Sequence, residues 1–252
     1  MSIETLFTLL AIIMVGTYFQ TVTGFGMGII VVGASSALGL TTVAVIAAVV
    51  SLITLVNCAV ALPGVARQTD WRVVFSVVLG VLPGIAAGVW LLDMLSDSAT
   101  NLLQGLLGSM IVYSAVNFFM RPEPGQRQSG RSSFVVSGFG SGLAGGLFGM
   151  AGPPLIYQFY RQPFDIKTIR NLLLISFAFT SSIRSVFIAV QGKLDTEILI
   201  LAGIAIPVVT LSTYLARQFP PPLSAEAMRR MVFGILMLIG LYLLIIAFSS
   251  WV

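Results

Sequence analysis

Long apolar stretches, separated by short polar loops, occupy almost the whole chain. From Thr5 to Ala66 there is no Asp, Glu, Lys or Arg, although a bilayer crossing needs only about 20 apolar residues. Further charge-free stretches lie at 73–92, 98–120, 132–160, 198–216 and 231–252. The pattern predicts an all-α, polytopic transmembrane protein with helical segments at 3–39, 42–64, 71–93, 98–120, 132–160, 168–191, 196–216 and 228–250.

The composition agrees with a surface that faces lipid. Hydrophobic residues make up 57% of the 252 residues and charged residues only 9%, whereas an average soluble domain has about 25% charged residues. Water is therefore not the main solvent of this surface, which excludes a soluble enzyme. The net charge of +4 comes from Lys and Arg scattered through short loops. Such cations indicate lipid headgroups rather than a nucleic acid as their partner.

The two halves of the chain resemble each other at a nearly constant offset of 123 to 126 residues. The matched positions are Phe25-Gly26-Met27 with Phe148-Gly149-Met150, Ser51 with Ser176, Asp70 with Asp195, Pro83 with Pro207, and Gly108 with Gly234. Between the halves lies a segment rich in Pro, Gly, Gln and Arg, which is typical of a solvated linker. The sequence therefore predicts a first transmembrane repeat at 1–120, a cytoplasmic linker at 121–131 and a second repeat at 132–252.

The first apolar segment of each half is interrupted by glycines, and its path decides the topology. If each such segment crossed the membrane once, Lys and Arg would divide evenly between the two sides, against the rule that cytoplasmic loops are enriched in cations. If each is instead a re-entrant hairpin, each half has three full crossings and the two repeats are inverted, as in many transporters. Most cations then gather on one side, namely Arg67, Arg72, Arg121, Arg127, Arg131, Arg161, Lys167, Arg170, Arg217, Arg229 and Arg230. We expect that side to be the cytoplasm of a bacterium, with both termini periplasmic.

Both glycine-rich segments should break their helices inside the membrane. They run from Thr21 to Gly28 and from Gly145 to Pro154, where glycine permits positive φ and proline forbids a continuous helix. A half-helix that begins after such a break directs free N–H groups and a partial positive charge at the tip, which suits an anion. The alternative is that these glycines only allow close helix packing.

The predicted substrate site gathers residues from the two breaks and from the polar positions beside them. Non-helical backbone at membrane depth has to be covered by protein or to line a cavity. The candidates are Gln20, Thr23, Gly24, Phe25, Gly26 and Met27 in the first half, and Gly149, Met150, Gly152, Tyr157 and Gln158 in the second.

A polar stripe on the helix after each break adds two further candidates. Ser51, Thr54 and Asn57 recur every three residues, and Ser176, Thr180 and Arg184 every four, so each set lies on one helix face. Such stripes either complete a cavity or bond neighbouring helices. Arg184 is the only charge deep within a predicted span, so it either attracts an anion within the bundle or snorkels to the outer headgroups. Asn57 and Arg184 join the predicted site.

The chain lacks the residues that catalysis or a cofactor would need. It contains no histidine and a single cysteine, which leaves no set of transition-metal or haem ligands. The run Gly140-Ser141-Gly142-Leu143-Ala144-Gly145 matches a dinucleotide-binding pattern, but no strand precedes it. We therefore expect no catalytic residues, no metal and no cofactor.

The paired breaks, Gly24–Gly28 and Gly145–Pro154, each followed by a helix with a polar stripe, resemble the TauE/SafE family of sulfite and organosulfonate exporters. The likeness extends over nearly the whole chain. It implies a secondary transporter that exports a small sulfur-containing anion such as sulfite or sulfoacetate, driven by the proton gradient, with the two glycine motifs forming the substrate site.

Three points stay open at the level of the sequence. An anion channel and a membrane scaffold without transport activity are the alternative functions. Proton coupling has no intramembrane Asp, Glu or His to rest on, so protons would travel on the substrate or on a loop acid such as Asp195 or Glu197. The oligomeric state is also open, with a homodimer as one option.

Overall fold

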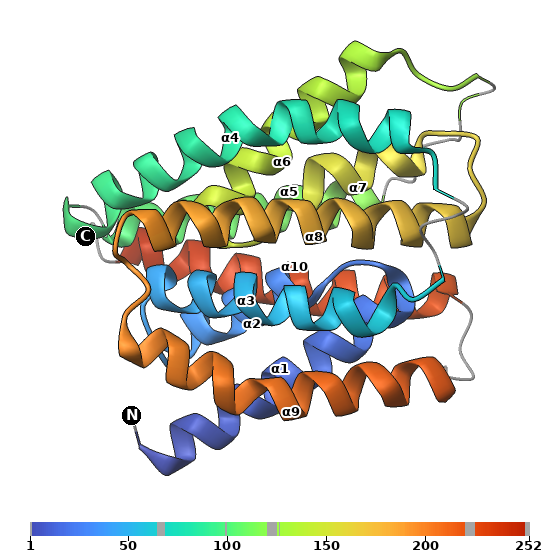
Figure 1. Ribbon diagram of the computed structural model, residues 1–252. Coiled ribbons are helices and arrows are strands. Elements are labelled where there is room, and N and C mark those ends of the chain that lie inside the picture. Colours follow the sequence, from blue (N-terminus) through green and yellow to red (C-terminus); the bar gives the residue numbers. More distant parts are fainter. Residues whose placement is uncertain are drawn as a thin grey trace.

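The computed structural model describes residues 2–64, 69–98, 100–119, 125, 127–219 and 225–249. Residues 121–124 and 126 of the predicted linker, and two predicted cytoplasmic cations, Arg67 and Arg121, lie outside this part of the chain. The described residues form ten helices and no strand (Figure 1). The helices are α1 Ile3–Thr23, α2 Met27–Ala37, α3 Val43–Ala61, α4 Trp71–Ser98, α5 Thr100–Phe119, α6 Arg131–Phe148, α7 Pro153–Tyr160, α8 Ile166–Val190, α9 Thr196–Gln218 and α10 Ala225–Ser249. The all-α prediction is confirmed.

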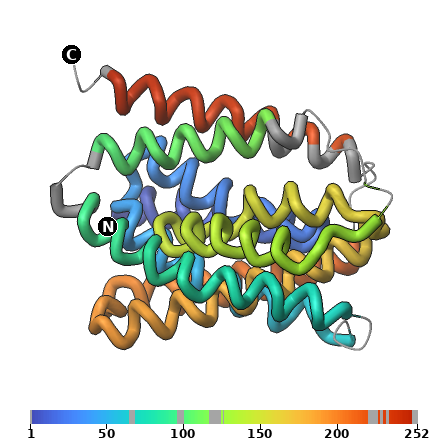
Figure 2. The backbone as a smooth tube through the Cα atoms, turned by 90° about the horizontal axis from the view of Figure 1, so that it is seen from above, coloured from blue at the N-terminus to red at the C-terminus, as the bar shows by residue number. Residues whose placement is uncertain are grey.

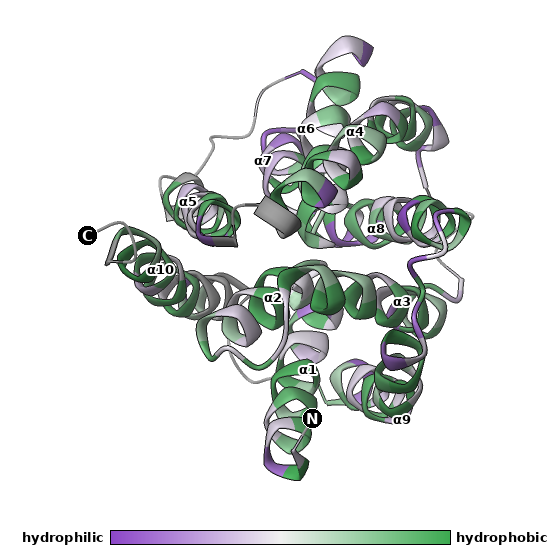
Figure 3. Cartoon of the chain, turned by 90° about the vertical axis from the view of Figure 1, so that its left-hand side faces the viewer, coloured by the Kyte–Doolittle hydropathy of each residue, from purple (hydrophilic) through white to green (hydrophobic). Residues whose placement is uncertain are grey.

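Helix length and composition identify a multi-span membrane protein. Within the described residues, five helical stretches are long and apolar enough to cross a bilayer: Ile3–Thr23, Val43–Ala61, Trp71–Leu95, Ile166–Val190 and Thr196–Gln218. Large apolar side chains such as Trp90, Leu238 and Phe248 project outward, and hydrophobic residues cover much of most helices (Figure 3). Polar side chains such as Asn57 and Thr213 are instead fully buried. This distribution suits lipid outside and an apolar interior that also holds a set of buried polar side chains.

The two glycine-rich segments each divide an apolar segment into a long and a short helix. Gly24, Gly26 and Gly149 adopt positive φ angles of 90°, 116° and 67°, which residues with a side chain rarely adopt. Pro153 and Pro154 occupy the first positions of α7, where the fixed φ of proline suits a helix start. The predicted breaks therefore lie where glycine and proline place them.

After each break the chain turns back along the helix that precedes it. A side chain added at Gly16 of α1 would lie 3.1 Å from the Val31 Cγ2 atom of α2, and the Thr17 hydroxyl donates to the sulfur of Met27 over 3.1 Å. In the second hairpin the Ser141 hydroxyl donates to the carbonyl of Ala151. Figure 2 shows the reversal between α6 and α7. The returning arms are short, since α2 has 11 residues and α7 has 8, about 16 and 12 Å of helix.

A glycine seam joins α4 to α6, and the sequence analysis did not identify it. Three glycines at a spacing of four on each helix let the backbones approach closely, namely Gly80, Gly84 and Gly88 on α4 and Gly138, Gly142 and Gly146 on α6. A Cβ atom added at Gly142 would lie 2.5 Å from the carbonyl oxygen of Val81, and one added at Gly146 would lie 2.6 Å from that of Ile85. Small residues at this spacing are a common basis of helix association in membranes. Because the contacts advance together along both chains, α4 and α6 run parallel.

Candidate functional site

The two breaks lie against each other in the interior of the bundle. A Cβ atom added at Gly28 would lie 2.7 Å from the Cβ of Met150, and one added at Gly152 would lie 3.5 Å from the Cδ1 of Ile29. The N-terminal ends of α2 and α7, the short helices of the two hairpins, therefore lie next to each other. A cavity lies there, and it is lined by Gln20, Gly26, Gly28, Ile29, Thr54, Gly149, Met150, Ala151, Gly152, Phe177 and Ser181.

This cavity, which we call the tip cavity, is narrow. Its volume is about 20 Å³ at the scale of a water-sized sphere, and a single water needs about 10–15 Å³ by that measure. A molecule with three or four oxygen atoms does not fit until the surrounding side chains or helices separate. The structure therefore represents a compact state of the tips.

The first hairpin supplies a set of unused hydrogen-bond donors. The N-terminus of α2 has no side-chain cap. Within the described part of the chain, the N–H groups of Gly26, Met27, Gly28 and Ile29 have no hydrogen-bond acceptor. Buried N–H groups are paired in the great majority of cases, and unpaired ones at a helix start, where the helix dipole is positive, are suited to an anion.

The second hairpin supplies donors in a different arrangement. Pro153 and Pro154 have no N–H group, so α7 contributes fewer helical donors than α2 does. The remaining N–H groups belong to Ala151, Gly152 and Leu155, and none of them bonds to a residue that the structure describes. The two tips are thus unequal donors, although the repeated Phe-Gly-Met sequence suggests equal ones.

Gln20 reaches the tip cavity from α1 and is held by a buried amide network. Its Nε2 donates to the Oδ1 of Asn57 over 2.9 Å, and the Nδ2 of Asn57 donates to the hydroxyls of Thr21 and Thr213 over 2.8 Å each. Asn57 is fully buried and does not line the cavity. Its place is behind Gln20, where it connects α1, α3 and α9.

Arg184 lies beside the second tip, with 1% of its surface exposed. Its Nε donates to the carbonyl of Gly146 over 3.1 Å, and its Nη1 donates to the carbonyl of Ala47 over 2.9 Å and to the hydroxyl of Ser51 over 3.0 Å. Among the described side chains no carboxylate forms an ion pair with it. The guanidinium faces the bundle interior rather than the headgroups, and it ties α8 to the second hairpin and to α3.

The other predicted residues of the first break shape the tip without lining the cavity. The Thr23 hydroxyl donates to the carbonyls of Phe19 and Phe25. A Cβ atom at Gly24 would lie 2.8 Å from the Cα of Arg170, whose Nε donates to the Thr21 carbonyl over 2.6 Å. The ring of Phe25 packs edge-on against Tyr160, and the sulfur of Met27 accepts from Thr17.

Two predicted residues of the second half lie away from the cavity. The ring of Tyr157 lies 5.5 Å from the guanidinium carbon of Arg161. The carbonyl of Gln158 accepts from the side chain of Gln162. Both follow the break by about one helical turn, which carries them past the tip.

The cavity also has walls that the sequence analysis did not name as site residues. Thr54 belongs to the polar stripe of the first half and Gly28 to its glycine motif, so the sequence contains a pattern that points to both residues. Ser181 lies next to Thr180, the stripe residue, but it is Ser181 that lines the cavity. Ile29, Ala151 and Phe177 are apolar, and no chemical pattern marks them in the sequence.

Similarity to known proteins identifies the family of this chain. The family model described as "Sulfite exporter TauE/SafE" matches residues 8–243. The chain belongs to the TauE/SafE family. It is 50% identical over 242 residues to a protein of Cupriavidus necator described as "Probable sulfite/organosulfonate exporter TauE", which covers 96% of this chain and 94% of that relative.

No solved structure matches the chain. TauE/SafE proteins are membrane exporters, so the chain is a membrane transporter and not an enzyme. The resemblance noted from the glycine motifs is confirmed.

Proposed function

We propose that this protein exports a small sulfur oxyanion, sulfite or an organosulfonate such as sulfoacetate, across the bacterial inner membrane. The observation that carries the proposal is the tip cavity, where the starts of two short helices meet with buried N–H groups that have no acceptor in the described chain. The name of the Cupriavidus necator relative supports the substrate class.

The chemistry of the cavity favours an anion over a cation. The described residues that line it include no Asp or Glu, and its donors are backbone N–H groups together with Gln20, Thr54 and Ser181. The oxygens of a sulfonate or sulfite accept such donors, and the helix dipoles of α2 and α7 stabilise the negative charge. A site built from neutral donors binds an anion and releases it again, because no fixed cation holds it in the cavity.

The arrangement of the helices supports alternating access between two inverted repeats. The α4–α6 pair runs parallel, as the glycine seam shows. The α1–α9 pair also runs parallel. The hydroxyl of Ser212 donates to the carbonyl of Met14 and the hydroxyl of Tyr18 donates to the carbonyl of Phe219, so the contacts advance in the same direction along both helices. If α6 corresponds to α1 and α9 to α4, the α4–α6 pair and the α1–α9 pair are equivalent in the two repeats. Figure 1 shows that the α4–α6 pair runs in the opposite direction to the α1–α9 pair.

The same view supports both termini on one side of the membrane, because α1 begins and α10 ends at the same end of the bundle (Figure 1). In this account one repeat moves against the other, opens the tip cavity to the cytoplasm, and then opens it to the periplasm. Protons would travel on the substrate or through Asp195 or Glu197, which lie at the start of α9.

Flux into proteoliposomes tests the proposal. Purified protein should exchange radiolabelled sulfite for unlabelled sulfite trapped on the other side, and exchange should saturate. A channel gives flux that does not saturate and no stimulation by trapped sulfite. A scaffold gives neither flux nor the thermal stabilisation that a bound anion provides by mass action.

Gly152→Ala tests the place of the site. Gly152 has an ordinary negative φ of −73°, and an added Cβ would meet only the ends of the Ile156 and Ile29 side chains, at 3.0 and 3.5 Å. The variant should fold and should reduce exchange by about tenfold, because the methyl group occupies a cavity with room for one water. The control is Gly203→Ala, where a Cβ would have no neighbour within 4 Å. Equal exchange by both variants would place the substrate elsewhere.

A further inference from the structure

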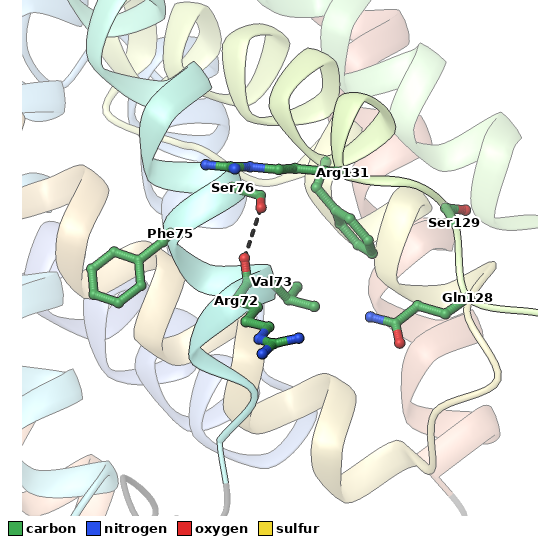
Figure 4. A pocket seen from close by; sticks show the side chains of 8 residues that line it. Arg72, Val73, Phe75, Ser76, Gln128, Ser129 and Arg131 are labelled. Carbon is green, nitrogen blue, oxygen red and sulfur yellow. Dashed lines mark hydrogen bonds between the residues drawn. The ribbon is translucent and has the colours of Figure 1, made fainter.

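A second cavity, remote from the tips, lies between the first turns of α4 and α6. Its volume is about 430 Å³. Arg72 and Phe75 of α4 form one wall, and Ser129, Arg131 and Phe134, from the segment entering α6 and from its start, form the other (Figure 4). We call it the basic groove. The transport mechanism proposed above does not use it.

The groove carries positive charge from four sources. Arg72 and Arg131 line it, and none of the described carboxylates forms an ion pair with either guanidinium. The positive ends of the α4 and α6 dipoles also meet there, because the two helices are parallel and begin at the same end of the bundle (Figure 1). The nearby carboxylate of Asp70 accepts the backbone N–H of Arg72 over 3.0 Å, so it caps α4 and offsets part of this positive charge.

The groove is apolar on the side that faces the membrane span. Phe75 is 60% exposed, while Val73 and Phe134 are buried and form the floor. Trp71, at the first position of α4, is 39% exposed, and tryptophan is enriched at the level of the headgroups. Charge at the end of the bundle and aromatic surface one turn deeper match a molecule with an anionic head and an apolar tail.

The wall formed by the chain before α6 is fixed in place. Gln162, which is 1% exposed, accepts the backbone N–H of Ser129 over 2.8 Å and donates to its hydroxyl over 3.0 Å. The glycine seam holds α4 and α6 in close contact just beyond the groove. The backbone separation between the two arginines is therefore set by packed helices and by the Gln162 hydrogen bonds.

We propose that the basic groove binds one anionic phospholipid, with its phosphate between Arg72 and Arg131 and an acyl chain along Phe75. Basic pockets between transmembrane helices bind anionic headgroups in this way, and arginine pairs well with phosphate oxygens. The bound lipid bridges α4 of the first repeat and α6 of the second, so it stabilises the seam along which the halves meet.

The test is binding of phosphatidylglycerol to the detergent-purified protein, followed by native mass spectrometry and by thermal unfolding. Arg72→Gln with Arg131→Gln should weaken binding by about thirtyfold, because each basic residue near an anionic headgroup contributes about 1 kcal/mol. Arg127→Gln with Lys167→Gln is the matched control, since it removes two exposed cations that do not line the groove. Arg72→Lys with Arg131→Lys should keep most of the binding and so shows that the groove remains folded.

Two further measurements separate a lipid from a free anion. Phe75→Ser should weaken binding of phosphatidylglycerol, while inorganic phosphate should neither stabilise the protein nor displace the lipid. Equal loss in the Arg72/Arg131 variant and in the control would overturn the proposal, because attraction would then come from overall charge. Displacement of the lipid by phosphate or sulfite at millimolar concentration would also overturn it and would make the groove a vestibule for free anions.

Discussion

Gly142→Ala is expected to destabilise the protein, although alanine is the better helix former. The added Cβ would lie 2.5 Å from the Val81 carbonyl oxygen and 2.9 Å from the Val81 Cα, where ordinary contact begins at 3.4 Å. Both obstacles are backbone atoms, so α4 and α6 have to separate by about 0.9 Å. A gap of this size costs the seam a quarter to a half of its dispersion energy at each contact.

The expected magnitude follows from that overpacking. Forcing extra atoms into a packed interior costs roughly 1–3 kcal/mol, and in a protein of this size each kcal/mol lowers the unfolding midpoint by about 2–4 °C. Gly203→Ala is the control, because it gives the same gain in helix propensity, about 1 kcal/mol, with no neighbour within 4 Å.

The assay is thermal unfolding of the detergent-solubilised protein, followed by tryptophan fluorescence. Gly142→Ala should unfold several degrees below Gly203→Ala, which should itself unfold at or above the wild-type midpoint. If the two variants unfold at the same temperature, α4 and α6 are not in backbone contact, and the seam between the halves has to be abandoned.

Three further variants test the site and its surroundings. Arg184→Gln should lower the stability by roughly 2 kcal/mol, because it removes charge-assisted hydrogen bonds to two carbonyls, and should slow sulfite exchange; an unchanged midpoint in thermal unfolding would show that these bonds contribute nothing. The hydroxyl and then the backbone N–H of Thr168 lower the pKa of Asp165 below its usual 3.8. The stability that the Asp165 cap contributes is therefore fully present above pH 3.8 and is lost as the pH falls through the lowered pKa. Asp165→Asn should lower the unfolding midpoint at pH 6 and have less effect at pH 3. Asp195→Asn with Glu197→Gln should flatten the pH dependence of exchange if those acids carry the proton, and an unaltered pH profile would leave the substrate as the carrier.

The helices and their breaks could be predicted from the sequence because they depend on local chemistry. Charge-free stretches bounded by polar loops define membrane spans, and glycine or proline at Gly24, Gly26, Gly149 and Pro153 cannot continue a regular helix. The predicted segments at 3–39 and 132–160 accordingly divide at those positions.

The walls of the cavity were only partly predictable because they depend on depth as well as on helix face. Helical spacing placed Asn57 and Arg184 on the interior side, but it does not say whether a side chain reaches the cavity or lies behind it. Asn57 bonds to Gln20, and Arg184 bonds to backbone carbonyls. Ser181 reaches the cavity in place of the stripe residue Thr180 because the exact rotation of α8 is set by its neighbours.

The glycine seam was visible as a spacing but not as a contact. Glycines recur every four residues at 80–88 and at 138–146, yet nothing in the sequence states that these two stretches face each other. In the sequence, part of the second run, Gly140–Gly145, matches a dinucleotide-binding pattern, whereas the structure places Gly142 of that motif in the packing of α4 against α6.

The most direct test of the account is an experimental structure of the protein with sulfite or sulfoacetate bound. The account predicts an anion between the two hairpin tips, with its oxygens accepting from the N–H groups of Gly28 and Gly152 and from Gln20, in a cavity wider than the one described above. An anion that occupies another position, with the tips still in contact, would contradict it.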